Sequence, residues 1–248
     1  MLNTDLEYEI NKKINSEKYK DYLPNGLQVE GRKIIKNIIT GVSACQELID
    51  IAINCDSDAI IVHHGYFWKN ESRRIVGIKY QRLRKLLSHN INLYAWHLPL
   101  DIHNELGNNI QLAKKLGVEN ISFLGKFAMQ GDLLIPMNGE NFKKHIKSVL
   151  SCNNILHFSK NAPNIIKKIS WCVGKGQDFI KLAIIKKMDA FISGEVSEET
   201  MHLAKEGKIH FYSAGHHSTE KIGIKALGNW LTKKYDLKIN FIDIPNPV

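Results

Sequence analysis

Imidazole and carboxylate side chains gather in three short segments of the chain, each placed directly after a run of strand-forming residues. The ligand-type residues of these segments are His63, His64, Asp101, His216 and Glu220. Because ligands of open α/β sheets bind where the carboxyl ends of the strands meet, we expect these side chains to share one crevice. Imidazole suits zinc, iron and nickel, and carboxylates add affinity for manganese and magnesium. The pattern predicts two divalent metal ions per chain, without specifying which metal.

The number and charge of these residues favour a dinuclear site over a structural one. Five ligands, two of them carboxylates, exceed the needs of a tetrahedral zinc, and Asp101 and Glu220 are natural bridging ligands. Two ions about 3.5–4 Å apart leave room for a shared water or hydroxide. Each feature alone has an ordinary structural explanation, because a histidine pair can be structural and a carboxylate ahead of a helix can be an N-cap. The combination carries the prediction.

A weak internal repeat organises the chain. Residues 38–64 align without gaps on residues 169–195, and each copy is expected to form a strand, a turn, a helix and a strand. Apolar residues at helical spacing predict helices near residues 45–54 and 177–187. Short apolar strands that alternate with helices indicate parallel sheets covered on both sides. A tandem duplication therefore explains the pattern, with chance similarity as the alternative.

The repeat also points to two residues that could move protons. His97 precedes Asp101 by four positions, as His216 precedes Glu220, so His97 is either an outer metal ligand or a general acid/base. Glu195 takes the place of His64 in the second copy, and it either supports a ligand or acts as a catalytic base. Three aromatic residues after His64, Tyr66 to Trp68, either wall a pocket for a flat ring or form part of the core.

The predicted fold class is α/β, with two related, interlocked lobes, largely parallel sheets and the metal site between the lobes. We expect the lobes at residues 1–125 and 126–248, with a C-terminal strand at 241–245 that returns to the first lobe. Residues 122–163 carry the least pattern and are expected to join the lobes. Proline and Asn-Gly turn signals predict a loop at 21–28.

Composition restricts the compartment and the partners. The chain has 248 residues, and no apolar run approaches the roughly 18 residues of a membrane helix. Its start is acidic and polar, unlike a secretory signal, and its four cysteines show no Cys-x-x-Cys spacing, so we expect a cytoplasmic protein without a membrane partner. The net charge of +9 comes with lysine pairs scattered along expected helix surfaces. Solvated faces explain this charge better than a nucleic-acid patch, which has weak support.

The chain resembles the dinuclear-metal-centre family of NGG-interacting-factor-like proteins, commonly labelled GTP cyclohydrolase 1 type 2 homologues, and is similar to short enterobacterial members. The stretches that carry the resemblance are 21–29, 63–68, 96–101, 191–195 and 215–220. The resemblance implies a cytoplasmic homohexamer, a toroid with metal pairs facing its inner cavity, and the five metal ligands named above. Other members have threonine and asparagine where this chain has Leu98 and Pro99, but the aspartate at 101 is kept.

The predicted function is that of a metal-dependent hydrolase acting on a small molecule, a nucleotide or a related heterocycle. A metal-bound hydroxide would attack, at C8 of guanine for a GTP cyclohydrolase, and His97 or Glu195 would move protons. One alternative is a non-catalytic hexameric metal-binding or regulatory protein. Another is a metal-dependent toroid that processes nucleic acid. Open coordination positions and a lined pocket would favour the enzyme.

Overall fold

The computed structural model describes residues 1–152 and 154–248, which divide into two compact units. Unit 1 comprises Met1–Gly107 and Gly223–Pro245, and unit 2 comprises Asn108–Ile222 and Asn246–Val248. Unit 2 begins at Asn108 in this division, whereas the sequence led us to expect the boundary near residue 125. The division also assigns residues 223–245 to unit 1. The α/β class with parallel central strands is confirmed in both units.

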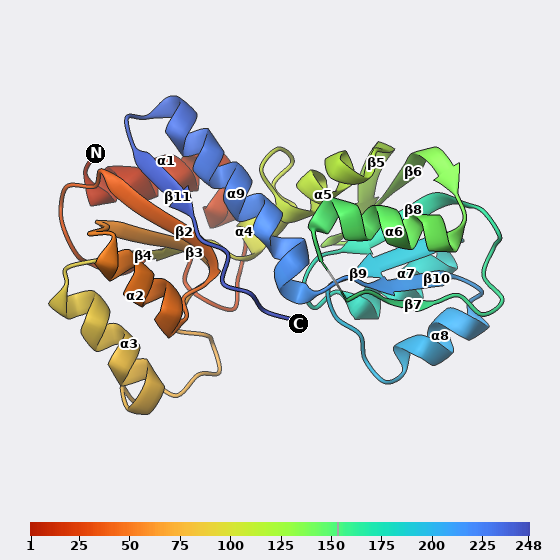
Figure 1. Ribbon diagram of the computed structural model, residues 1–248, viewed down its shortest axis with the longest axis horizontal. Helices are drawn as coiled ribbons and strands as arrows, with labels where there is room; N and C mark the ends of the chain where they lie inside the picture. Colours follow the sequence, from red (N-terminus) through yellow and green to blue (C-terminus); the bar gives the residue numbers. More distant parts are fainter. Residues whose placement is uncertain (153) are drawn as a thin grey trace. The chain divides into compact units, whose positions relative to one another are not determined.

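Unit 1 is built around a five-stranded sheet of order β1-β4-β3-β2-β11. The strands β4, β3, β2 and β11 run parallel, and β1 is an antiparallel edge. Figure 1 shows β11, from the end of the chain, beside β2. The elements of unit 1 are α1 (Asn3–Ile14), η1 (Ser16–Lys18), β1 (Gly26–Val29), β2 (Asn37–Ser43), α2 (Gln46–Asn54), β3 (Ala59–His64), α3 (Gly77–Ser88), β4 (Asn92–Ala95), α4 (Leu98–Ile102), most of α9 (His216–Lys234) and β11 (Lys238–Phe241).

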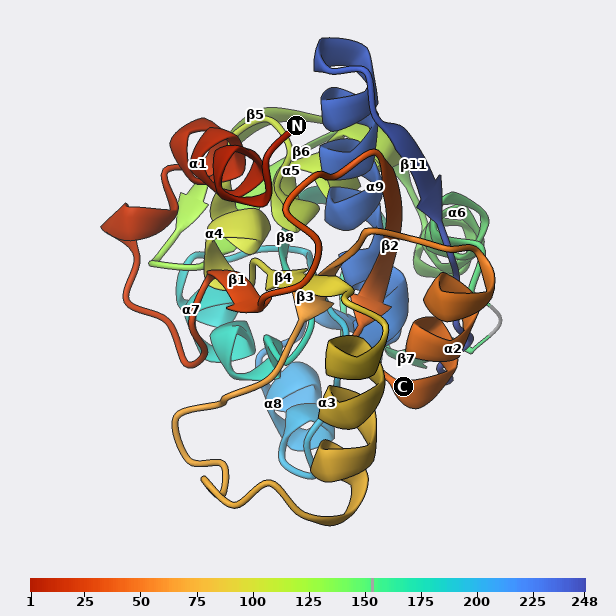
Figure 2. The same cartoon turned by 90° about the vertical axis from the view of Figure 1, so that its left-hand side faces the viewer.

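Both faces of this sheet are covered, which explains its unbroken apolar strands. Ile38 and Ile61 point to the face that packs on α1 and α9, where Leu227 joins the same core. Their neighbours Ile39 and Ile60 point to the opposite face, against α2 and α3. The two helix layers lie on opposite sides of the strands in Figure 2. The sheet therefore holds the strand ends at fixed positions.

Unit 2 is built around a six-stranded sheet of order β5-β6-β8-β9-β10-β7. Its centre, β8-β9-β10, is parallel, and the remaining pairs are antiparallel. The helices α5 and α6 cover one face, and α7 and α8 cover the other. The elements are α5 (Asn108–Leu116), β5 (Val118–Leu124), β6 (Ala128–Met137), α6 (Gly139–Leu150), β7 (Leu156–Phe158), β8 (Ile166–Cys172), η2 (Gln177–Phe179), α7 (Ile180–Ile185), β9 (Ala190–Ser193), α8 (Thr200–Glu206), β10 (His210–Ser213) and the start of α9.

The strand register confirms the internal repeat. Ile38 pairs with Ala59 between β2 and β3, and Ile169 pairs with Ala190 between β8 and β9, so both pairs differ by 131 positions. A carboxylate repeats as well. Oδ2 of Asp58 accepts the backbone N–H groups of residues 36 and 37, and Oδ2 of Asp189 accepts those of residues 167 and 168. The two halves thus share a strand–helix–strand unit down to individual hydrogen bonds.

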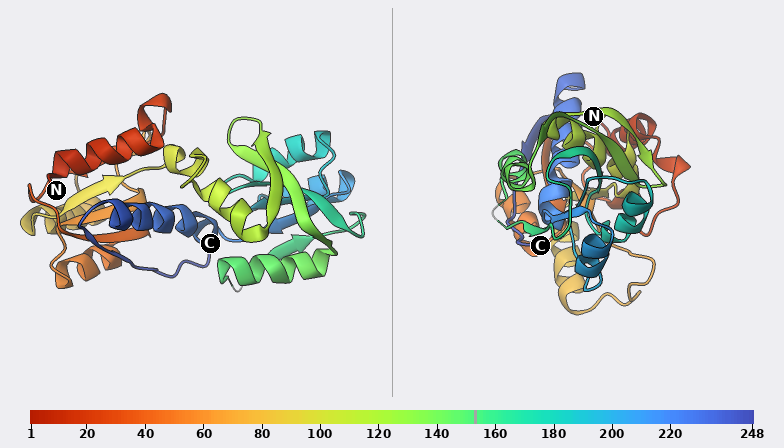
Figure 3. Two further views of the ribbon diagram at one scale, coloured as in Figure 1. Left: turned by 90° about the horizontal axis from the view of Figure 1, so that it is seen from above. Right: turned by 90° about the vertical axis from the view of Figure 1, so that its right-hand side faces the viewer.

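Three boundaries differ from those expected. The described residues of 122–163 are not a simple connection, because they include the end of β5, then β6, α6 and β7 (Figure 3). The apolar residues Leu134 and Ile135 of β6 are exposed, which hid its alternation. The last strand is Lys238–Phe241, ahead of the expected 241–245. Helix α9 begins at His216, which was expected simply to follow a strand, since its first turn is too polar to show helical periodicity.

The loop predicted at 21–28 is shorter in the structure, because β1 begins at Gly26. Residues 21–25 precede this strand and lie outside any helix or strand. Among residues 1–152 and 154–248, no helix combines the length and the apolar composition that a membrane span requires.

Candidate metal centre

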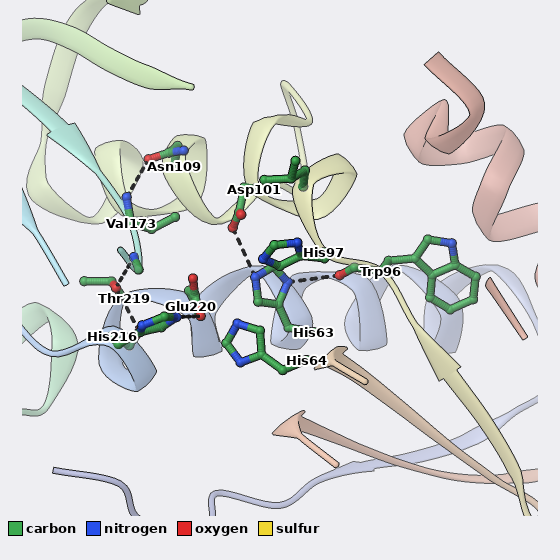
Figure 4. A network of polar contacts seen from close by, with 12 residues as sticks. His63, His64, Trp96, His97, Asp101, Asn109, Val173, His216, Thr219 and Glu220 are labelled. Carbon is green, nitrogen blue, oxygen red and sulfur yellow. Dashed lines mark hydrogen bonds and ion pairs between the residues drawn. The ribbon is translucent and has the colours of Figure 1, made fainter. Parts of the chain in front are cut away.

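In unit 1, three histidines meet where two neighbouring parallel strands end. His63 and His64 are the last residues of β3, and His97 follows β4 and precedes α4. The three rings each offer a nitrogen within 4.8 Å of the others (Figure 4). Gly65 makes this end of β3 possible, because a Cβ there would lie 2.1 Å from Oε1 of Gln28. His63 and His64 thus lie together at a strand end, where the sequence led us to expect them, and His97 joins them.

Oxygen atoms hold the Nδ1 atoms of these histidines. Nδ1 of His63 lies 2.9 Å from the carbonyl oxygen of Trp96, and Nδ1 of His97 lies 2.8 Å from Oδ1 of Asp21. Because carbonyl and carboxylate oxygens only accept hydrogen bonds, both rings carry a proton on Nδ1, and in the neutral form of each ring the lone pair is on Nε2. Nδ1 of His64 lies 3.1 Å from the hydroxyl of Ser43. A second contact that fixes the tautomer in this way is typical of metal-binding histidines.

Asp101 adds a carboxylate to the cluster. It lies on the short helix α4, is buried, and places Oδ1 3.4 Å from Nε2 of His63. Pro99 marks the start of this helix, because proline lacks an N–H and the N–H groups of a first helical turn have no partner within the helix. Unit 1 therefore brings together His63, His64, His97 and Asp101.

In unit 2, one histidine lies between two carboxylates. His216 and Glu220 are one turn apart at the start of α9, with Nε2 of His216 2.9 Å from Oε2 of Glu220. Nδ1 of His216 lies 2.7 Å from Oε1 of Glu195. Burial disfavours the charged imidazole, but the hydrogen bonds and charges of Glu220 and then Glu195 raise the pKa of His216 to about 9. The carboxylates that favour a proton here also favour any other cation.

Close packing fixes the carboxylate of Glu220. Gly174, after β8, has a φ of +59°, and a Cβ at this position would lie 2.0 Å from Oε1 of Glu220 and 3.1 Å from Nε2 of His216. The backbone N–H of Gly174 donates to the hydroxyl of Thr219, at 3.1 Å (Figure 4). The glycine is therefore required both by its backbone conformation and by the nearby carboxylate.

The repeat is imperfect at the site itself. By strand register Ala95 matches Ser213, so His97 matches Gly215, and His216 comes one residue later. His64 matches Glu195, as expected. The two units thus use equivalent strand ends with different side chains, which is why one half offers mainly imidazoles and the other mainly carboxylates.

Sequence reasoning missed Asp21 and Ser43, which contact the histidines from segments far away in the chain. The stretch around Asp21 was noted only as a predicted loop and for its family resemblance. Of the aromatic residues, Tyr66 is buried in the core and donates its hydroxyl to the carbonyl of Ala44, at 2.7 Å. Trp68 borders the histidines, with its ring centroid 5.1 Å from that of His97. The core explanation thus holds for Tyr66.

Comparison with known proteins identifies the family of the chain. A family model described as Duf34/NIF3 (NGG1p interacting factor 3) matches residues 1–247. The chain belongs to this family. The resemblance proposed from its motifs is confirmed.

Relatives of this family cover the chain from end to end. Proteins named GTP cyclohydrolase 1 type 2 homolog are 56% identical in Buchnera aphidicola subsp. Schizaphis graminum and 50% identical in Escherichia coli K12, each over 247 residues and all of both chains. A solved structure described as protein ybgI, of unknown function, is 49% identical and covers all of both chains with a TM-score of 0.98. The protein TTHA1606 from Thermus thermophilus, at 28% identity, also covers both chains, with a TM-score of 0.91.

Proposed function

We propose that the chain binds two divalent metal ions through His63, His64 and Asp101 of unit 1 and His216 and Glu220 of unit 2. One observation carries the proposal. An oxygen atom lies against Nδ1 in each of four histidines, which leaves Nε2 as the nitrogen to bind a metal ion: His63, His64, His97 and His216. The donor set also fits, because imidazole and carboxylate suit zinc, iron, nickel, manganese or magnesium.

We further propose a hydrolase that acts on a nucleotide or a related heterocycle, in keeping with the name that the relatives carry. When bound, the divalent ions would polarise the substrate and make a nearby water more acidic. The lone pair on Nε2 of His97 suits it to accept a proton, since Asp21 holds the proton on Nδ1. Glu195 contacts His216, and in this proposal it either orients that ligand or accepts a proton.

The first test is metal content. We expect about two ions per chain by elemental analysis after reconstitution, and the loss of at least one ion in both Asp101→Ala and Glu220→Ala. His202→Ala serves as the control, because His202 is an exposed histidine of unit 2. Full metal content in both carboxylate variants would remove these residues from the proposed centre.

The second test is turnover. Metal-reconstituted protein is screened against nucleotides, phosphoesters, amides and small heterocycles, with Glu220→Ala as the matched control. Activity that depends on Glu220 supports a hydrolase. Equal turnover by both proteins rules out the metal as catalyst, and metal binding without turnover favours the non-catalytic, regulatory alternative.

The family resemblance also leads us to propose a cytoplasmic homohexamer. Light scattering at low micromolar concentration should report roughly six times the chain mass of 28.3 kDa. A monomer with full metal content and activity would contradict the assembly while leaving the metal centre intact.

A further inference from the structure

We infer that Asp21 is a positioning residue, which fixes the tautomer of His97 and so aims Nε2 of His97 at His63 and His64. The inference rests on the proposed function, since the position of Nε2 matters to the reaction only if the site carries out that function. It starts from the loop of residues 21–25, which contains none of the predicted metal ligands or proton carriers.

The Asp21 carboxylate is saturated with hydrogen bonds. Its side chain is 2% exposed. Oδ1 accepts from Nδ1 of His97 at 2.8 Å and from the backbone N–H of Tyr22, and Oδ2 accepts from the backbone N–H of Leu98 at 2.8 Å and from Nδ2 of Asn25 at 3.0 Å. A buried carboxylate surrounded by donors stays ionised, and towards the ring it can only accept a hydrogen bond.

The same loop also holds the backbone of His97. Oδ1 of Asn25 accepts the N–H of His97 at 2.8 Å. Residue 97 is therefore held at two places, its main chain by Asn25 and its ring by Asp21. With Nδ1 directed at Asp21, the opposite edge of the ring faces the nitrogen cluster of His63 and His64.

The substitution Asp21→Asn separates anchoring from control of the tautomer. The part-buried N–H of Leu98 and Nδ2 of Asn25 both donate to the Oδ2 position, so the new amide oxygen takes that place. The new NH₂ group then faces Nδ1 of His97, while the N–H of Tyr22, whose hydrogen bond is exposed, can turn to water. An NH₂ donor requires an unprotonated Nδ1, so the proton of the neutral ring moves to Nε2, where it blocks a metal or an incoming proton.

The primary measurement is the protonation of the His97 ring nitrogens by ¹⁵N NMR in metal-free protein at pH 8. We expect the proton on Nδ1 in the wild type and on Nε2 in Asp21→Asn. A wild-type ring protonated on Nε2 would overturn the inference, and this test requires no variant to fold. An unchanged tautomer in a folded Asp21→Asn protein would overturn it as well.

Zinc affinity, measured by competition with a chelator, supplies the second readout. His97 groups with His63 and His64 and is the candidate outer ligand of the centre, so we expect a loss of about 10–100-fold in Asp21→Asn. The matched control is Asp56→Asn, which removes the same charge from an exposed carboxylate of unit 1 that pairs with Arg32, and its loss should stay below about threefold. Equal losses in the two variants would attribute the effect of Asp21 to its charge alone. A wild type that binds no zinc but keeps the Nδ1 tautomer refutes the proposed metal centre and supports the positioning role.

Discussion

The substitution Gly174→Ala tests whether the position of Glu220 matters more than the stability of the fold. The new Cβ would lie 2.0 Å from Oε1 of Glu220, whereas non-bonded atoms rest about 3.5 Å apart. The carboxylate must therefore move by roughly 1.5 Å, and metal–ligand distances tolerate only about 0.2 Å. We expect a loss of metal affinity of at least about tenfold.

The same substitution also costs stability through the backbone conformation of residue 174. A substitution at a second glycine measures this backbone cost by itself. Gly117 has a φ of +70° and lies in the same unit, but a Cβ there would meet nothing within 4 Å. An alanine in this left-handed conformation costs about 1–2 kcal/mol at either position. Urea denaturation of the metal-free proteins should therefore show a loss of this size in Gly117→Ala and a loss at least as large in Gly174→Ala.

The assay is isothermal titration with Zn²⁺ or Mn²⁺ on wild type and both variants. Gly117→Ala should bind metal like the wild type, and Gly174→Ala should not. If Gly174→Ala keeps wild-type affinity, the position of Glu220 is irrelevant to metal binding. If both variants lose affinity equally, the effect belongs to the fold and not to the carboxylate.

Further predictions concern stability and ligand orientation. The folded pKa of His216, about 9, exceeds the unfolded value near 6.5, so its stabilisation is complete below about pH 6.5 and is lost as the pH rises to about 9. Urea denaturation of chelator-treated protein should show a fall of at most about 3 kcal/mol over this range, and a fall of the same size in His216→Gln would contradict it. Glu195→Gln should weaken metal binding about 10–100-fold by titration calorimetry, and an unchanged affinity would leave Glu195 without a role in orienting His216. Asp58→Asn should lose about 1–3 kcal/mol of unfolding free energy, more than Asp189→Asn, because Asp58 also bonds Arg32 at 2.9 Å; equal losses would refute this.

The sequence predicted the parts of the site that depend on local pattern. His63 and His64 end an apolar strand, and that strand lies where the repeat placed it. The orienting contacts could not be predicted in the same way, because Asp21 reaches His97 over 76 positions of chain and Ser43 reaches His64 over 21. A contact between residues so far apart in the chain leaves no periodic pattern in the sequence.

Other differences have physical causes of the same kind. Strand β6, which lies between β5 and β8, carries exposed apolar residues, so its pattern did not separate an inner face from an outer one. His216 and Glu220 were expected just after a strand and lie instead on the first turns of α9, since a polar helix start shows no apolar periodicity. Their spacing of four residues was the signal that a helix would place them on one face.

Because unit 1 is made of the first 107 residues and residues 223–245, the ribosome must synthesise all of 108–222 before unit 1 can be completed. At roughly 5–20 residues per second, this takes on the order of ten seconds. During that time β2 lacks its neighbour β11, and the core around Ile38 lacks Leu227. A nascent chain would therefore carry an open sheet edge and uncovered apolar surface, the two features most prone to aggregation. The order of synthesis makes the folding of this chain dependent on protection during translation, whereas unit 2 receives nearly all of its residues in one continuous stretch.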